Sequence, residues 1–243
     1  PVIRAEVIRR LKSNKTWEIV NQKVAEFFTN TVQKILTIED ATTALEAYYH
    51  YLEIGYYQQA AEVILKSRDN QWGQFLPLGS TLYRLGLIQP ILVAINKIIP
   101  NIDNSKYLAE LYNILGDLFC IKGDIHQAID GQEKTITMAK AEFKKVEINA
   151  QNKHDLYYLK MLEVDSILSI GLYYIDLWEL ELAAVAFKKV INLTSNSDHY
   201  KWGEKATITL ALVNSYLGFK AINIFTEIDA KCDLAKAYFQ LAL

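Results

Sequence analysis

The stretch YNILGDLFCIKGDIHQAI, residues 112–129, decides the fold of this 243-residue chain. An apolar residue stands directly before Gly116, an aromatic residue follows at Phe119, and a glycine and an alanine come at Gly123 and Ala128. Two antiparallel helices pack closely only where small side chains face each other and large ones fill the flanks. The stretch therefore predicts two helices joined at Gly123, with Gly116 buried against Ala128.

This spacing resembles the two-helix unit of tetratricopeptide repeats, and it recurs along the chain. Gly171 and Ala183 are 12 residues apart, as are Gly116 and Ala128. Weaker matches predict turns at further positions, so the full set of expected turns is Gly55, Gly86, Gly123, Trp178 and Gly218. The resemblance implies an all-α fold, a right-handed superhelix of antiparallel helix pairs in a TPR-like α-solenoid.

The domain organisation follows from the apolar spacing. Residues 1–40 carry apolar residues at helical intervals and are expected to form N-terminal capping helices, which would cover the open end of the stack. Residues 41–243 are expected to hold about five TPR-like helix pairs. Between Gly218 and Asp229 the sequence predicts a loop, followed by a last helix.

One interval is longer than the rest. The turn positions Gly123 and Trp178 lie 55 residues apart, whereas the family's period is about 34. We therefore expect long helices or an insertion near 141–160, with any break at Asn149–Lys153.

Composition excludes several classes of protein. The net charge of −2 and pI of about 6.2 argue against a nucleic-acid binder. No apolar run reaches the roughly 18 residues that a membrane span needs. Two isolated cysteines and the lack of a signal peptide indicate a cytoplasmic protein. We expect a piece of a longer protein, because the chain lacks an initiating Met and ends in mid-pattern.

No constellation of residues supports catalysis. None of the four histidines, His50, His126, His154 and His199, stands at zinc-ligand spacing. Phosphate-binding glycine loops and a Gly-x-Ser-x-Gly elbow are also missing. The sequence therefore predicts no catalytic residues, no metal, no cofactor and no enzymatic activity.

The family resemblance implies a binding surface. In tetratricopeptide repeats the first helix of each pair lines a concave groove that holds a peptide or helix of a partner. Carried onto this chain, the groove positions are Tyr49, Leu52, Ser80, Tyr83, Glu110, Asn113, Asp117, Asp165, Leu168, Leu172, Lys205, Ile208 and Leu212. Glu110, Asp117 and Asp165 are acidic, so a basic or apolar partner segment is expected rather than a terminal carboxylate.

Two functions remain open. The first is a protein-interaction or scaffold module in a signalling protein, with self-association through terminal repeats. The alternative is a helical sensor that binds a small molecule in a tyrosine-rich pocket between helices, near Tyr83 or Tyr173. Residues 45–61, LEAYYHYLEIGYYQQAA, also resemble the first repeat after the nucleotide-binding module of STAND-type signalling ATPases. That likeness implies that the parent protein is such an ATPase and that this chain is its sensor arm.

Overall fold

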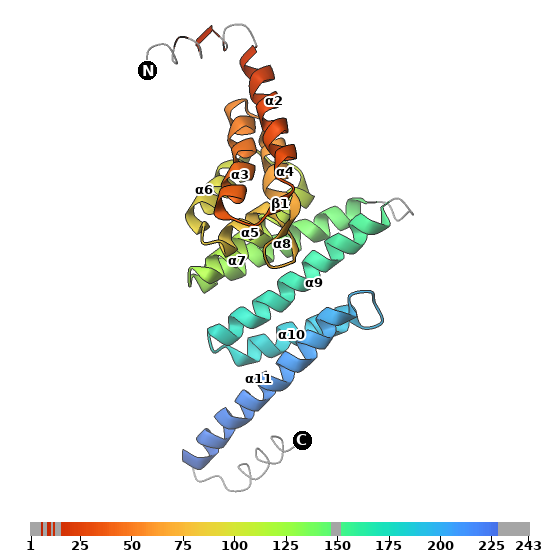
Figure 1. Cartoon of the computed structure of the whole chain (residues 1–243). Coiled ribbons are helices and arrows are strands. Elements are labelled where there is room, and N and C mark those ends of the chain that lie inside the picture. Colours follow the sequence, from red (N-terminus) through yellow and green to blue (C-terminus); the bar gives the residue numbers. More distant parts are fainter. Residues whose placement is uncertain (1–5, 7–8, 11, 13–15, 147–151, 228–243) are drawn as a thin grey trace. The chain divides into compact units, whose positions relative to one another are not determined.

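A computed structural model gives the fold and describes residues 6, 9–10, 12, 16–146 and 152–227. The chain divides into two compact units, Pro1–Leu118 and Phe119–Leu243. Helices form nearly all of the regular structure in both units, and they follow one another as hairpin-like pairs (Figure 1). The predicted all-α repeat fold is confirmed.

The first unit begins with α2 (Thr16–Thr31), which packs against α3. α2 corresponds to the second predicted capping helix, and most of the first lies outside the described residues. The remaining elements are α3 (Ile38–Glu53), α4 (Tyr57–Leu65), α5 (Leu78–Arg84), α6 (Ile88–Ile98), the 3-10 turn η1 (Ile99–Asn101) and α7 (Ser105–Ile121), whose last residues belong to the second unit. Thr37 and Asp40 form a capping box at the start of α3, which satisfies amides that the helix leaves free.

One turn recurs at the end of the first helix of each pair. Gly55, Gly86 and Gly123 have positive φ angles of 74°, 85° and 81°, and Trp178 has 61°. In each turn the next residue's amide donates to a carbonyl oxygen five residues back, for example from Asp124 to Phe119. Four of the five predicted turn positions are thus confirmed. The four turns share the same backbone hydrogen bond, so the repeat is visible in the backbone geometry as well as in the sequence.

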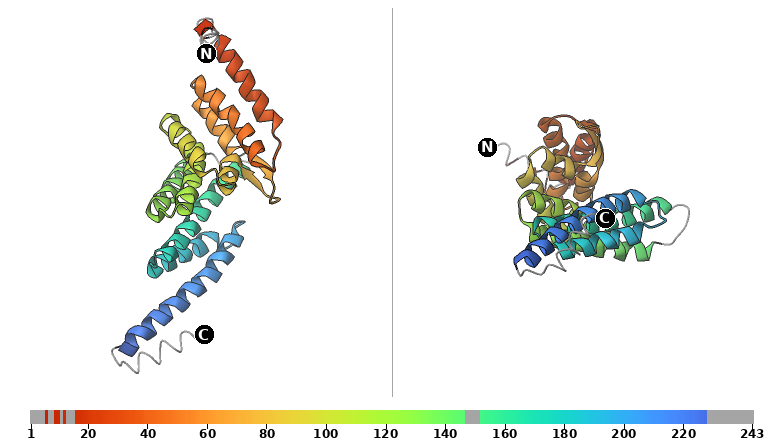
Figure 2. Two further views of the ribbon diagram at one scale, coloured as in Figure 1. Left: turned by 60° about the vertical axis from the view of Figure 1, so that its left-hand side comes forward. Right: turned by 90° about the horizontal axis from the view of Figure 1, so that it is seen from below.

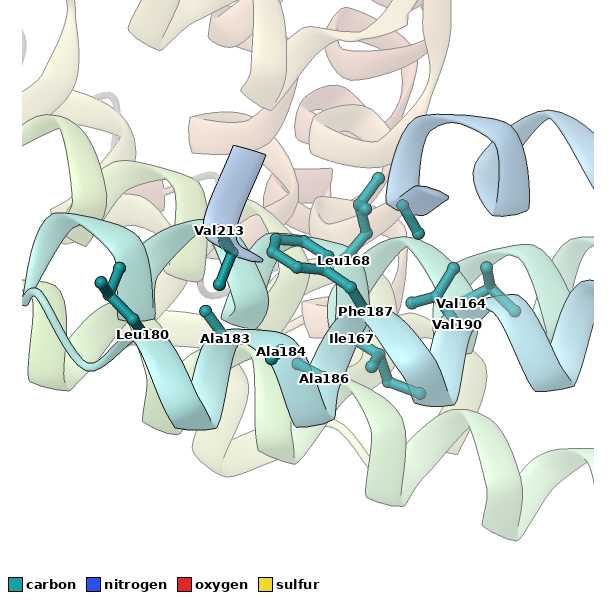
Figure 3. Packing of buried hydrophobic residues seen from close by; sticks show 11 residues of the cluster. Val164, Ile167, Leu168, Leu180, Ala183, Ala184, Ala186, Phe187, Val190 and Val213 are labelled. Atoms are coloured by element: carbon teal, nitrogen blue, oxygen red, sulfur yellow. The ribbon is translucent and has the colours of Figure 1, made fainter. Parts of the chain in front are cut away.

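The small residues singled out in the sequence are buried, as predicted. Ala128 and Ala183 are fully buried, and Gly116 is buried as well. A Cβ atom added to Gly171 would lie 2.6 Å from Cε1 of Phe187, so only glycine fits between α9 and α10. Figure 3 shows Phe187 within the apolar cluster that these helices share.

A small sheet in the first unit was not predicted. β1 (Lys34–Ile35) pairs in parallel with β2 (Ser67–Asn70), and β2 pairs antiparallel with β3 (Phe75–Pro77). Arg68 of β2 is buried and donates from Nε to the carbonyl oxygen of Val32 at 2.9 Å. Strands of two to four residues are too short to show alternating hydrophobicity, so their residues carry no recognisable strand pattern.

The second unit stacks α8 (Ile125–Lys145), α9 (Lys153–Asp176), α10 (Leu180–Thr194) and α11 (Tyr200–Glu227), each against the next. Both views in Figure 2 show α9, α10 and α11 side by side. The long interval is helical on both flanks. Of the expected break at Asn149–Lys153, residues 149–151 lie outside the described residues, and Lys153 is already the first residue of α9.

The turn and loop predicted from Gly218 are wrong over the described residues. α11 continues without a break to Glu227, and Gly218 is buried inside it. A glycine in a helix interior costs only about 1 kcal/mol relative to alanine, which packing along so long a helix offsets. The helix predicted beyond Asp229 falls in residues 228–243, outside the described part.

Candidate functional site: the α9–α11 surface

The predicted groove positions share a register within each repeat. Tyr49, Ser80, Asp117 and Leu172 each lie six residues before the turn residue of their helix pair. Their surroundings nevertheless differ. Tyr49 and Leu172 are exposed, whereas Ser80 and Asp117 are partly buried. A common register therefore does not make these positions one equivalent surface.

In the first unit, the predicted groove residue Tyr83 is not accessible to a partner, because it is buried and hydrogen-bonded within the fold. Tyr83 is buried, and its hydroxyl donates to Oδ2 of Asp117 at 2.9 Å. Burial first, and then the Asp117 carboxylate, raise the pKa of the Tyr83 hydroxyl. The expectation that Tyr83 is an open groove residue is wrong, because its ring fills the interior of the unit.

The other predicted residues of the first unit offer less open surface than expected. Leu52, Glu110 and Asn113 are each only partly exposed. Glu110, Asn113 and Asp117 also take part in interactions within the fold. The first unit therefore leaves Tyr49 as its main exposed groove position.

In the second unit, α9 and α11 are held together at two points. Nε1 of Trp202, near the start of α11, donates to Oδ1 of Asp165, in the middle of α9, at 2.9 Å. The ring of Trp178, in the turn after α9, lies 5.4 Å between centroids from that of Tyr216, in the middle part of α11. These contacts run in the same order along both helices, so α9 and α11 lie parallel.

Large apolar side chains are exposed on α9, on the turn after it and on α11. Leu172 of α9 is 42% exposed and Trp178 of the following turn 57%. On α11, Leu212 is 47% exposed and Ile208 73%. We call the set Asp165, Leu172, Trp178, Lys205, Ile208, Leu212 and Tyr216 the α9–α11 surface. Leu168, also predicted here, is instead buried in the core with Phe187, because its position on α9 turns toward α10 (Figure 3).

Charge at this surface is unevenly distributed. The Asp165 carboxylate is partly buried and already accepts the Trp202 hydrogen bond, so it is less available than expected. Asp176 and Glu179 are exposed on either side of Trp178, while Lys205 is exposed on α11. The accessible acidic charge of the surface therefore gathers at the Trp178 end.

Trp178 is an exposed residue that the predicted groove positions did not include, and its backbone conformation distinguishes it. A left-handed conformation costs an ordinary L-residue roughly 1–2 kcal/mol. The three equivalent turns use glycine, which adopts this conformation without that cost. A tryptophan that keeps a strained backbone and an exposed ring suggests a functional role. The signal was present in the sequence as the one turn position without glycine among the four confirmed.

A shallow hollow of about 530 Å³ adjoins the surface where α10 meets α11. Ile208, Tyr200 and Thr207 line it together with Glu204. Ile208 thus contributes both to the hollow and to the α9–α11 surface, which extends the apolar area available to a partner.

The tyrosines predicted to form a ligand pocket pack inside the two units. Besides Tyr83, Tyr48 is buried and donates to the carbonyl oxygen of Ala94 at 3.0 Å. Burial first, and then Tyr49, raise the pKa of the Tyr48 hydroxyl to about 12. Tyr173 is buried with its hydroxyl 3.5 Å from Nε2 of Gln132. These rings act as packing residues with satisfied polar ends.

Within residues 16–146 and 152–227, and the few described residues before them, no group of three or more His, Cys, Asp or Glu side chains is placed to hold a metal ion. No helix within these ranges is long and apolar enough to cross a membrane.

Comparisons with known proteins give a loose structural likeness. No protein-family model and no curated protein sequence matches the chain. One crystal structure of MamA overlaps 93% of this chain and 90% of its own at 16% identity, with a TM-score of 0.47. Another MamA structure overlaps 84% of this chain and 88% of its own at 18% identity, with a TM-score of 0.45. Likeness at this level adds nothing to the assignment of function.

Proposed function

We propose that this chain is a protein-interaction module whose α9–α11 surface binds an apolar segment of a protein partner. The observation that carries the proposal is the exposed set Leu172, Trp178, Ile208 and Leu212 on α9, the turn after it and α11, since α9 and α11 are fixed side by side. Large exposed apolar side chains gathered in this way are typical of interaction sites. Aromatic anchors such as Trp178 often carry much of the binding energy.

The acidic residues beside Trp178 indicate the charge expected on the partner. Asp176 and Glu179 flank Trp178, so a basic residue next to the apolar segment would meet unlike charge at that end. Such exposed pairs mainly raise the association rate and lose their effect as salt screens them. The expected ligand is therefore an apolar segment followed or preceded by Lys or Arg.

Three expectations from the sequence stay predictions. They are self-association through the terminal repeats, a cytoplasmic location, and a parent protein that is a STAND-type signalling ATPase. Of the predicted groove residues, Leu172, Lys205, Ile208 and Leu212 belong to the proposed site as binding residues. Asp165 acts through Trp202 to hold the two helices together.

The proposal is tested by quantitative capture of partners from the source cell. Leu212→Asp places a charge in the middle of the surface and is expected to abolish capture of the specific partner. Val185→Asp is the matched control, because Val185 is 64% exposed but lies on α10, outside the surface. Equal capture by the wild type and Leu212→Asp, or equal loss with both variants, would contradict the proposal.

A further inference from the structure

A second hollow, between α8 and α9, differs in chemistry from the α9–α11 surface. It measures about 530 Å³ and is lined by Ala139, Lys140, Phe143, Lys144, Leu159, Lys160 and Glu163. This volume falls within the range of small-molecule sites, roughly 300–1,000 Å³. Its lining combines an apolar wall with several charged ends, so it can hold a ligand that has both kinds of group.

The apolar wall is formed by residues from both helices. Ala139 and Leu159 are buried, whereas Phe143 leaves part of its ring exposed. A flat apolar body can rest against such a ring by stacking or edge contact. The hollow therefore favours a ring-bearing ligand over a small inorganic ion.

The charged ends are held in place by one buried carboxylate. Glu163 lies 2.7 Å from Nζ of Lys160 and 3.2 Å from Nζ of Lys140, through different oxygens. Burial acts to raise the pKa of Glu163, but the two lysines outweigh it, so the pKa lies below its ordinary value. Glu163 thus stays ionised and fixes two ammonium groups from opposite helices at the hollow.

Positive charge remains in excess. Three lysines face one glutamate among the lining residues, which leaves a net charge of two positive. Lys144 is exposed and makes no ion pair with any residue that the structure describes. An anionic group entering the hollow would therefore find one ammonium group that has no ion-pair partner among the described residues and two that are already positioned.

We infer that the hollow between α8 and α9 binds a small amphipathic carboxylate, an aromatic ring bearing one carboxylate group. The ring of the ligand lies against Phe143 and Leu159. Its carboxylate accepts hydrogen bonds from Nζ of Lys144 and from the N–H groups of Lys140 Nζ that do not face Glu163. This site is separate from the protein-binding surface, since no residue is shared between them.

The test uses 2-naphthoate as the probe and isothermal titration as the measurement. We expect saturable binding with a dissociation constant of about 1 mM or tighter. Acetate, which lacks the ring, and 2-naphthylmethanol, which lacks the charge, are expected to bind at least about tenfold more weakly. Added salt should weaken naphthoate binding, because exposed charges are screened.

Matched variants locate the site. Lys144→Gln is expected to weaken naphthoate binding several-fold without lowering the melting temperature, since Lys144 is exposed. Lys189→Gln on α10 removes an equally exposed charge outside the hollow and is expected to change nothing. Binding of 2-naphthylmethanol as tight as that of naphthoate, equal affinity of Lys144→Gln and wild type, or no binding at millimolar concentrations would each overturn the inference.

Discussion

Asp117 and Leu172 occupy the same position of the repeat, yet the fold uses them in opposite ways. Asp117 accepts a hydrogen bond from the buried Tyr83 and so closes the groove position in the first unit. Leu172 extends an apolar side chain into solvent beside α11. The difference teaches that register alone does not define a binding surface, because a neighbouring side chain can fill the position from within.

The largest expected effect concerns the packing beneath the open surface. Gly171→Ala would place a Cβ atom 2.6 Å from the ring of Phe187, which is fully buried, so the ring or the helices must shift. Overpacking of this kind costs about 1–3 kcal/mol of the free energy of unfolding. Denaturant unfolding measures it, with Ser169→Ala on the same helix as the control. An unchanged midpoint for Gly171→Ala would show that α9 and α10 are not packed as described.

The closed position of the first unit is tested by Tyr83→Phe. The variant keeps the ring and removes the donor to Asp117. Because Asp117 is only partly buried, water can replace the donor, and the loss should be at most about 1.5 kcal/mol, the lower end for a hydrogen bond to a charged group. Trp202→Phe is the counterpart in the second unit, since it removes the donor to Asp165. We expect Tyr83→Phe to lower stability and leave partner capture intact, whereas Trp202→Phe should weaken both. Reduced capture of the partner by Tyr83→Phe would contradict the claim that Tyr83 only stabilises the first unit and takes no part in binding.

A smaller effect on the free energy of unfolding is expected when the pH is lowered and Glu163 becomes protonated. The folded-state pKa of Glu163 lies below the ordinary value of 4.5. Its contribution to stability is therefore fully present above that value and is lost as the pH falls through the lower folded pKa. Glu163→Gln should remove this part of the pH dependence, so that the wild type and the variant converge in stability as the pH falls below the ordinary pKa of 4.5. Curves that stay parallel down to pH 2 would show that the lysine pairs do not stabilise the charged form.

The smallest effect on stability is expected at Trp178. Trp178→Gly relieves the left-handed backbone but removes the ring contact with Tyr216, so the two changes should cancel to within about 1 kcal/mol. Partner binding should nevertheless fall strongly, because the ring is the aromatic anchor of the proposed surface. Comparing melting temperature with partner capture separates the two effects. A variant that is stable and binds normally would remove Trp178 from the site.

Much of the repeat architecture could be predicted from the sequence because it depends on local signals. Gly55, Gly86 and Gly123 mark turns that require positive φ, and Ala128 and Ala183 mark close packing. The sheet was missed because its strands are very short. The turn at Gly218 was wrong because a glycine can also lie inside a long helix. Whether Tyr83 and Leu168 are exposed depends on the residues that pack around them. Those residues are distant in the sequence, so a local pattern does not reveal the burial.

The most direct measurement is site-specific photo-crosslinking in the source cell. A benzoyl-phenylalanine is placed either at Leu212, in the centre of the α9–α11 surface, or at the similarly exposed Val185 on α10. We predict a discrete crosslink to a protein partner from position 212, lost on the additional change Trp178→Gly, and none to that partner from position 185. Equal crosslinking from both positions, or a partner joined only at position 185, would contradict the assignment of this surface as the binding site.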